Sequence, residues 1–216
     1  MQKDYEIAVF AGDGIGPEIT EPTVEILAEL SRLAKGYSLS LVHAEAGAAH
    51  YAKTGESLPQ MSMIKARRAD AILLSAMGLP DVRYDDGTEI SPQIDLRKAL
   101  TLFAGVRPVS VRVGQMTPLK IPEGKEIDFV LIRESTEGLF YTQGRGEVSD
   151  NEARETLRIT RDISEKLFRF TFELAAMRKA SGRGPGRVTC VDKANVFRAF
   201  AFSAAYSTKR PRVIPK

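Results

Sequence analysis

The apolar and polar positions of the first hundred residues follow two alternating patterns. Short apolar runs at 7–10 and 71–74 predict buried strands, and 38–44 alternates in the manner of a strand. Apolar residues recur at three- and four-residue steps over 17–34, which predicts a long amphipathic helix, and 58–66 predicts a shorter one. Because strands that alternate with helices are typical of parallel sheets, we expect an α/β fold.

A further helix has marked ends. Ser91 is a candidate N-cap, and Pro92 stands at the first helical position, where its missing N–H costs nothing. Gly105 is predicted to end this helix. Arg97 lies within the helix, and Arg107 lies just beyond it at the start of a strand.

The pattern changes after Arg107, where we place a domain boundary that separates residues 1–106 from residues 107–216. The elements predicted in the second part are strands at 109–113 and 128–132, an extended hairpin or arm at 139–148, a helix over 152–179, a strand at 188–191 and a helix from 194 to 201.

Composition narrows the class of protein. The chain has 216 residues, of which 43% are hydrophobic and 27% charged, and its net charge is +3, all ordinary for a globular protein. We expect no membrane segment, because no apolar run is long enough and the N-terminus has no secretory pattern. The single cysteine, Cys190, excludes an internal disulfide, so we expect a cytoplasmic protein in which Cys190 is a core residue. The basic tail at 209–216 lacks interleaved aromatic residues, so nucleic acid is not an expected partner.

Two features are candidates for chemistry, and each has two interpretations. Arg97, Arg107 and Arg133 stand at helix and strand ends, where their planar forks could hold a substrate with several carboxylates or could be solvated surface charges. Gly12, Gly14 and Gly16 come after a predicted strand and stand at the start of a predicted helix. Their spacing fits either a turn that cradles phosphate or a tight turn that needs positive φ.

Four stretches taken together resemble the isocitrate/3-isopropylmalate dehydrogenase family of β-decarboxylating dehydrogenases. They are 12–18 (GDGIGPE), 96–108 (from Leu-Arg-Lys to Arg-Pro), 133–138 (RESTEG) and 192–196 (DKANV). They stand in the family's order at roughly its spacing, and the resemblance covers about residues 5–200. It implies a two-domain α/β fold, with 1–106 as part of the cofactor-side domain and 107–216 as a second domain with a dimerisation arm.

The resemblance also implies an activity. Family members oxidise a 2-hydroxy di- or tricarboxylate with NAD or NADP, expel carbon dioxide with the help of Mg or Mn, and form homodimers. Site residues carried over from the family motifs are the substrate-binding Arg97, Arg107 and Arg133 with Ser91, the catalytic Lys193, which acts from the neighbouring subunit, and Gly14, Ile15 and Asn195 near the cofactor.

The chain departs from the family at three places. Phe140 stands where the family has a proton-donating tyrosine, which leaves the adjacent Tyr141 as the candidate acid and Lys193 or water as alternatives. Ser91 matches isocitrate enzymes but Ile90 and Gln93 do not, so the substituent on the malate core stays open between a polar or small group and isopropyl.

The third departure concerns the metal. The family's metal-binding aspartates lie after the lysine, and we find no counterpart to them, so no metal ligand is assigned. Nothing in the sequence groups the remaining candidates, which are Asp13, Asp70, Asp85 and Asp192. We therefore expect a C-terminally truncated dehydrogenase that is inactive by itself. The alternative is a non-catalytic truncated paralogue that binds carboxylates or pairs with a full-length subunit.

Overall fold

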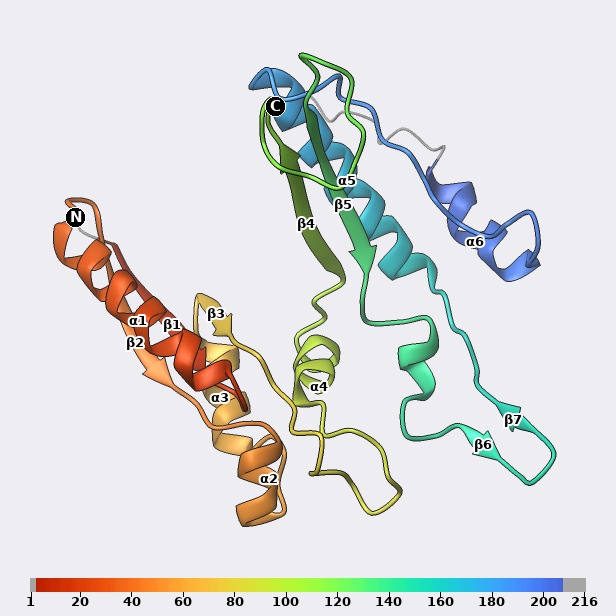
Figure 1. The fold of residues 1–216 in the computed structure, drawn as a ribbon. Helices are drawn as coiled ribbons and strands as arrows, with labels where there is room; N and C mark the ends of the chain where they lie inside the picture. The colour runs from red at the N-terminus through yellow and green to blue at the C-terminus, as the bar shows by residue number, and fades with distance from the viewer. Residues whose placement is uncertain (1–2, 208–216) are drawn as a thin grey trace. The chain divides into compact units, whose positions relative to one another are not determined.

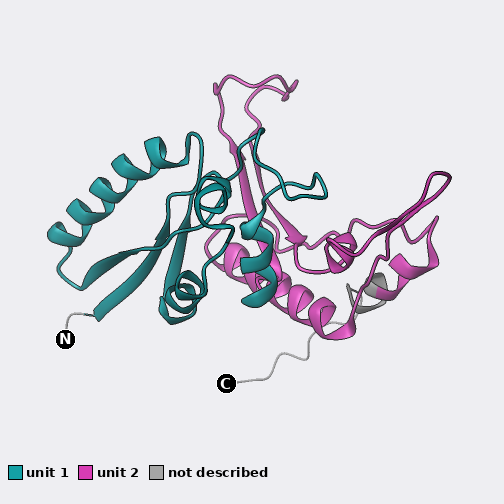
Figure 2. Cartoon of the chain, turned by 90° about the horizontal axis from the view of Figure 1, so that it is seen from below, with its two compact units in different colours: residues 1–100 teal, residues 101–216 magenta. Residues whose placement is uncertain are grey.

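The computed structural model describes residues 3–207 and divides the chain into two compact units. Unit 1 comprises Met1–Leu100 and unit 2 comprises Thr101–Lys216 (Figure 2). The boundary predicted after residue 106 would fall inside the strand β4 (Ala104–Val111). Because β4 pairs along its whole length with β5 (Ile127–Glu134), all of it lies in unit 2.

Unit 1 is built on a three-stranded parallel sheet, as the alternating pattern predicted. Its strands are β1 (Lys3–Phe10), β2 (Tyr37–His43) and β3 (Ala71–Leu74), in the order β2-β1-β3 (Figure 1). The central strand β1 is the most protected, and its last three residues, Ala8, Val9 and Phe10, are fully buried. The four-residue apolar runs at 7–10 and 71–74 therefore correspond to the central strand β1 and the edge strand β3.

Helices cover both faces of this sheet. The helices of unit 1 are α1 (Gly16–Leu33), α2 (Ala48–Thr54), α3 (Gln60–Arg68) and α4 (Pro92–Ala99). Successive strand residues face opposite sides. Ala8, Phe10 and Ile72 pack with Ala66 of α3, whereas Leu73 faces α1. Leu96 of α4 belongs to the α3-side cluster and is 2% exposed, so α4 is anchored to the unit 1 core.

The helix α4 is shorter than predicted. It ends at Ala99, and Thr101 adopts a positive φ of 52° just beyond it. The prediction that Gly105 ends the helix is wrong, because Gly105 is a residue of β4.

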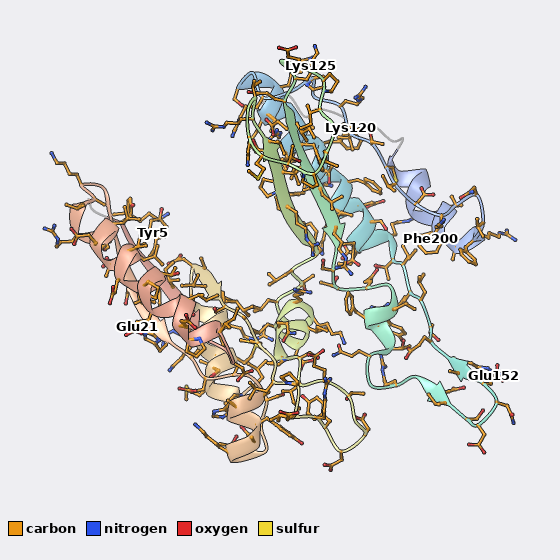
Figure 3. The ribbon with its side chains drawn as sticks, viewed as in Figure 1. Tyr5, Glu21, Lys120, Lys125, Glu152 and Phe200 are labelled. Carbon is orange, nitrogen blue, oxygen red and sulfur yellow. The ribbon has the colours of Figure 1, made fainter. Side chains whose placement is uncertain are left out.

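Unit 2 contains the antiparallel pair β4 and β5, the long helix α5 (Arg161–Ala180) and the helix α6 (Arg198–Ser207). A 3-10 helix at Leu139–Thr142 leads to a small hairpin, β6 (Glu147–Val148) and β7 (Ala153–Arg154), whose turn carries Glu152 (Figure 3). Figure 3 also shows Lys120 and Lys125 in the loop that joins β4 to β5.

Three sequence predictions in unit 2 were wrong in detail. Residues 152–160 are not helical, residues 188–191 form no strand, and the last helix begins at Arg198 rather than at 194. Cys190 is consequently exposed instead of being a core residue. In the part of the chain that the structure describes, no helix is long and apolar enough to cross a membrane.

We predict that Leu96→Ala destabilises unit 1 by about 3 kcal/mol, because it removes a buried side chain and leaves a cavity in the α3-side core. Urea unfolding followed by circular dichroism measures the change. Leu102→Ala is the matched control, since Leu102 is 47% exposed, and it should change the unfolding free energy by less than about 0.5 kcal/mol. Equal losses for the two variants would contradict the assignment of α4 to the core.

Candidate functional site

Two of the predicted arginines lie on neighbouring strands of one sheet. Arg107 of β4 is opposite Leu131, and Arg133 of β5 is opposite Gly105. Directly opposed residues of an antiparallel pair point to the same face, and positions two residues apart on a strand do so as well. Arg107 and Arg133 are therefore diagonal neighbours on one face of the β4–β5 sheet, within reach of a single small ligand.

Neither arginine is neutralised by the protein. Across residues 3–207, neither Arg107 nor Arg133 forms an ion pair with a carboxylate, and both side chains belong to exposed residues. The guanidinium of Arg133 lies 5.7 Å from the centre of the Phe140 ring. A guanidinium near an aromatic face keeps its edge N–H groups available to an anion.

The carboxylates closest in sequence to Arg133 are hydrogen-bonded elsewhere. Glu134 accepts hydrogen bonds from the backbone N–H of Thr136 at 2.6 Å and of Glu137 at 3.0 Å. Glu137 is buried and accepts from the backbone N–H and the hydroxyl of Thr160, each at 2.8 Å, and from Arg158 at 3.4 Å. The turn after β5 thus binds its own acids and leaves Arg133 without one.

The candidate acid Tyr141 lies in a different environment. Its ring is contacted by the guanidinium of Arg158 at 4.0 Å and that of Arg145 at 4.8 Å, whereas Phe140 is the residue beside Arg133. The sequence predicts an extended hairpin or arm at 139–148, but both residues lie in a 3-10 helix, in which adjacent side chains diverge by about 120°.

Ser91 and Arg97 belong to α4 in unit 1. Ser91 stands at the N-cap position but makes no side-chain capping bond, and its hydroxyl donates to the carbonyl oxygen of Glu89 at 3.3 Å. Arg97 is half-buried and, within residues 3–207, has no ion pair. On the same helix, desolvation raises the pKa of the Asp95 carboxyl, and Lys98 opposes that shift.

The residues next to Ser91 differ in their access to a ligand. Ile90 is fully buried, so its apolar side chain is part of the core and does not line a binding surface. Gln93 holds its side-chain oxygen Oε1 buried without a hydrogen-bond partner in the described chain. A buried acceptor without a donor costs about 1–3 kcal/mol.

Lys193 and Asn195 are exposed residues of a turn in unit 2. The carbonyl oxygen of Lys193 accepts from the N–H groups of Val196 and Phe197, which shapes the turn, and its ammonium group is open to solvent. Asp192 accepts a hydrogen bond from the backbone N–H of Ala194 at 2.6 Å. These hydrogen bonds therefore shape the turn that carries the exposed residues Lys193 and Asn195.

The glycine-rich turn between β1 and α1 is closely packed. Gly12 has φ +73°, and a Cβ there would lie 2.0 Å from the carbonyl oxygen of Ala76. At Gly16 a Cβ would lie 2.2 Å from the carbonyl oxygen of Ala11. These two glycines are required by the approach of the chain after β3, which is the tight-turn interpretation of the motif.

Asp13 of this turn is a structural residue. It is 3% exposed, and its carboxylate accepts backbone hydrogen bonds from Ala48 at 2.7 Å and Ala49 at 2.8 Å, at the start of α2, and from Gly78 at 3.1 Å. It thereby ties the end of β1 to α2 and to the loop after β3. Sequence reasoning missed this role, although an acid at such a turn can be expected to bind backbone N–H groups.

The start of α1 offers few groups to a phosphate. The N–H of Gly16 donates to the carbonyl oxygen of Asp13, Pro17 has no N–H, and Glu18 adds negative charge to the first turn. Gly14 and Ile15 are exposed on the tip of the turn. Their contact with a cofactor stays a prediction.

The described residues do not form a divalent-metal site. Nowhere in residues 3–207 do three His, Cys, Asp or Glu side chains come together, although Mg²⁺ and Mn²⁺ need several oxygen ligands. Asp13 and Asp70 both accept backbone hydrogen bonds, and Asp192 does so as well. The residues present therefore do not fit the metal, and we derive no reaction step through one.

Comparison with known proteins identifies the family of this chain. The family model for isocitrate/isopropylmalate dehydrogenase matches residues 6–209. The chain belongs to the isocitrate/isopropylmalate dehydrogenase family. Members typically use NAD(P) and a divalent metal, act on 2-hydroxy acids and are cytoplasmic.

Curated relatives and solved structures agree with this assignment. The 3-isopropylmalate dehydrogenase of Bacillus cereus is 37% identical over 197 residues, which are 89% of this chain and 52% of the relative. That of Staphylococcus saprophyticus is 36% identical over 194 residues, 89% of this chain and 54% of the relative. The chain thus spans about half the length of the curated relatives it matches.

Comparison with solved structures confirms the family fold as well. The crystal structure of isocitrate dehydrogenase from Methylococcus capsulatus matches with a TM-score of 0.72 at 25% identity, covering 94% of this chain and 56% of that one. The β-decarboxylating dehydrogenase from Thermococcus kodakarensis matches with a TM-score of 0.63 at 28% identity, covering 94% and 53%. The predicted α/β fold, present in part, is therefore correct.

We predict that Asp13→Ala lowers the unfolding free energy by about 3 kcal/mol, because three backbone N–H groups lose a charged acceptor. Asp81→Ala, at an exposed position in the loop after β3, is the control and should change it by less than about 0.5 kcal/mol. Thermal and urea unfolding measure both. A stable Asp13→Ala protein would show that the carboxylate does not hold these segments.

Proposed function

We propose that this chain provides the substrate-binding arginines of an NAD(P)- and metal-dependent dehydrogenase that decarboxylates a malate-derived 2-hydroxy acid. The observation that carries the proposal is the Arg107–Arg133 pair, which shares one sheet face and has no ion pair within residues 3–207. Exposed cations without partners are common, but a diagonal pair whose neighbouring acids are bound elsewhere is suited to a carboxylate.

The proposed roles follow from the chemistry of each side chain. Arg107 and Arg133 bind carboxylate oxygens of the substrate through paired N–H groups and neutralise their charge. Arg97 supplies the third guanidinium of the family motif. Lys193, an exposed residue, takes the proton of the 2-hydroxyl group onto the nitrogen of its side-chain amine, acting from the neighbouring subunit. NAD(P), when bound, accepts the hydride.

Proton return after loss of carbon dioxide has three candidate donors. Tyr141 is one, and its ring is contacted by two guanidinium groups. Lys193 and water are the others. Phe140, which occupies the position beside Arg133, carries no proton to donate.

The substituent on the malate core is proposed from Gln93. Its buried side-chain oxygen has no hydrogen-bond partner within residues 3–207, and Ile90 is fully buried. These features support a substituent with a hydrogen-bond donor, or a small one that admits a bridging water, over an isopropyl group. They give no reason to exclude isopropylmalate as a weaker ligand.

A second candidate function is a non-catalytic protein that binds carboxylates or pairs with a full-length family member. One observation favours this function: the described residues assemble no group of three metal-binding side chains. The arginine pair serves this function equally well, so catalysis itself has to be tested. Homodimer formation is part of the first proposal by family analogy.

We predict that Arg107→Ala and Arg133→Ala each weaken the binding of a 2-hydroxy dicarboxylate by about tenfold or more, the cost of a lost charged hydrogen bond. Isothermal titration of this chain with malate and 3-isopropylmalate measures the affinities. Arg112→Ala is the control, because Arg112 is exposed just past the end of β4. Unchanged affinity in both pair variants would refute the assignment of the carboxylate site.

We predict that the purified chain forms no NADH or NADPH with Mn²⁺ and isopropylmalate, isocitrate, tartrate or malate, because its described residues hold no metal site. Absorbance at the reduced-nicotinamide band follows the reaction, with a full-length family enzyme as positive control. Clear turnover by this chain would contradict the prediction and would favour a catalytic protein over the non-catalytic alternative.

A further inference from the structure

One of the two paired arginines is in direct contact with an aromatic ring. The guanidinium carbon Cζ of Arg133 lies over the Phe140 ring, 5.7 Å from its centre. Within residues 3–207 this guanidinium forms no ion pair and no hydrogen bond, so the ring is its side-chain partner. A cation over an aromatic face is attracted by the negative potential of the ring.

Two other guanidinium groups nearby also contact an aromatic ring, but they have oxygen partners as well. Arg158 and Arg145 both contact the Tyr141 ring. Arg158 forms an ion pair with Glu137 at 3.4 Å, and Arg145 donates a hydrogen bond to the backbone carbonyl oxygen of Tyr141. In the described chain Arg133 has a ring contact without such an acceptor.

Backbone contacts fix the start of the 3-10 helix that carries Phe140. Gly138 precedes this helix with φ +68° and ψ −132°, a conformation that glycine adopts readily and other residues rarely. The N–H of Gly138 donates to the carbonyl oxygen of Arg158 at 2.8 Å, and its carbonyl oxygen accepts from the N–H of Arg158 at 3.2 Å. The buried Glu137 binds Thr160 through two hydrogen bonds of 2.8 Å, which ties the same turn to the start of α5.

The end of the 3-10 helix is fixed as well. Thr142 is 8% exposed, and its hydroxyl forms a hydrogen bond with the carboxylate of Glu155. The helix is therefore bonded at both ends to the segment 155–158, and these bonds set the place of Phe140 before its ring meets a guanidinium. The long side chain of Arg133 is the flexible member of the contact, so the ring orders the arginine.

We propose that Phe140 is a positioning residue whose ring holds the guanidinium of Arg133 in one orientation beside that of Arg107. An arginine side chain has many rotamers, and ordering it when a ligand binds lowers the affinity. A guanidinium that rests on a ring has lost part of this freedom in advance, while its edge N–H groups stay open to a carboxylate. The inference rests on the proposed function, in which Arg133 binds a carboxylate of the substrate.

The first experiment measures the mobility of Arg133 in the full chain without a ligand. The heteronuclear Overhauser effect of each arginine Nε–Hε group reports motion on the picosecond to nanosecond scale. We expect Arg133 to be more rigid than Arg112, which is exposed just past the end of β4. Phe140→Leu should make Arg133 as mobile as Arg112, and Phe140→Tyr, which keeps the ring, should preserve the wild-type rigidity.

The second experiment measures the affinity for malate by isothermal titration. Phe140→Leu should weaken binding about fivefold, the effect of ordering one long side chain, and Phe140→Tyr should stay within about twofold of the wild type. Leu139→Ala is the matched control in both experiments, because Leu139 is 59% exposed on the same 3-10 helix and has no ring. Circular dichroism verifies folding, and Phe140→Met, which removes the ring but keeps a large side chain, replaces Phe140→Leu if that variant does not fold.

The outcomes separate this inference from the proposed function. If Arg133 is as mobile as Arg112 in the wild type, or if Phe140→Leu leaves its mobility unchanged, the ring does not position the guanidinium. Loss of affinity that Phe140→Tyr fails to restore would show a packing role only. If Arg133→Ala binds malate as tightly as the wild type, the proposed carboxylate site is wrong, and the mobility of Arg133 still decides the role of Phe140.

Discussion

The hydrogen bonds of Glu134 and Glu137 commit the two acids that follow Arg133 to partners other than its guanidinium. Both acids lie within four residues of Arg133, and either could have neutralised it as an ion pair. Glu134 instead binds the N–H groups of the turn that follows it, and Glu137 binds Thr160 at the start of α5. Three of these bonds are donated by backbone N–H groups and one by the hydroxyl of Thr160. The charge of Arg133 is consequently available to a ligand.

In unit 1, residues of a candidate binding motif likewise form structural contacts. The glycine-rich turn has the appearance of a phosphate-binding loop, but its acid and two of its glycines serve the packing of β1 against the loop after β3 and the start of α2. Only Gly14 and Ile15 remain exposed on the turn. The motif thus places an exposed tip at the end of the central strand.

The sequence predicted the architecture of unit 1 well because its strands and long helix are strongly periodic. Local rules failed where tertiary contacts decide. Gly105 could not be recognised as a strand residue because its partner in the sheet, Arg133, is distant in sequence. The run around Cys190 has strand composition but forms no strand, and Cys190 is exposed.

The candidate site was predictable in part. Arg107 and Arg133 were identified from family motifs, and only the β4–β5 register shows that they share a face. The environment of Tyr141 could not be predicted, because the sequence indicates an extended segment at 139–148 where a 3-10 helix forms at its start. The hydrogen-bond partners of Glu134 and Glu137 could be identified only from the structure, although acids followed by Thr and Gly can be expected in such turns.

The most direct measurement of the central claim is nuclear magnetic resonance of the arginine side chains during titration with malate. If Arg107 and Arg133 hold one carboxylate-bearing ligand, their Nε–Hε signals shift together and saturate at the same ligand concentration, while the signal of Arg112 stays in place. If the two signals titrate independently, or if Arg112 shifts to the same extent, the arginine pair is a solvated surface and the account is wrong.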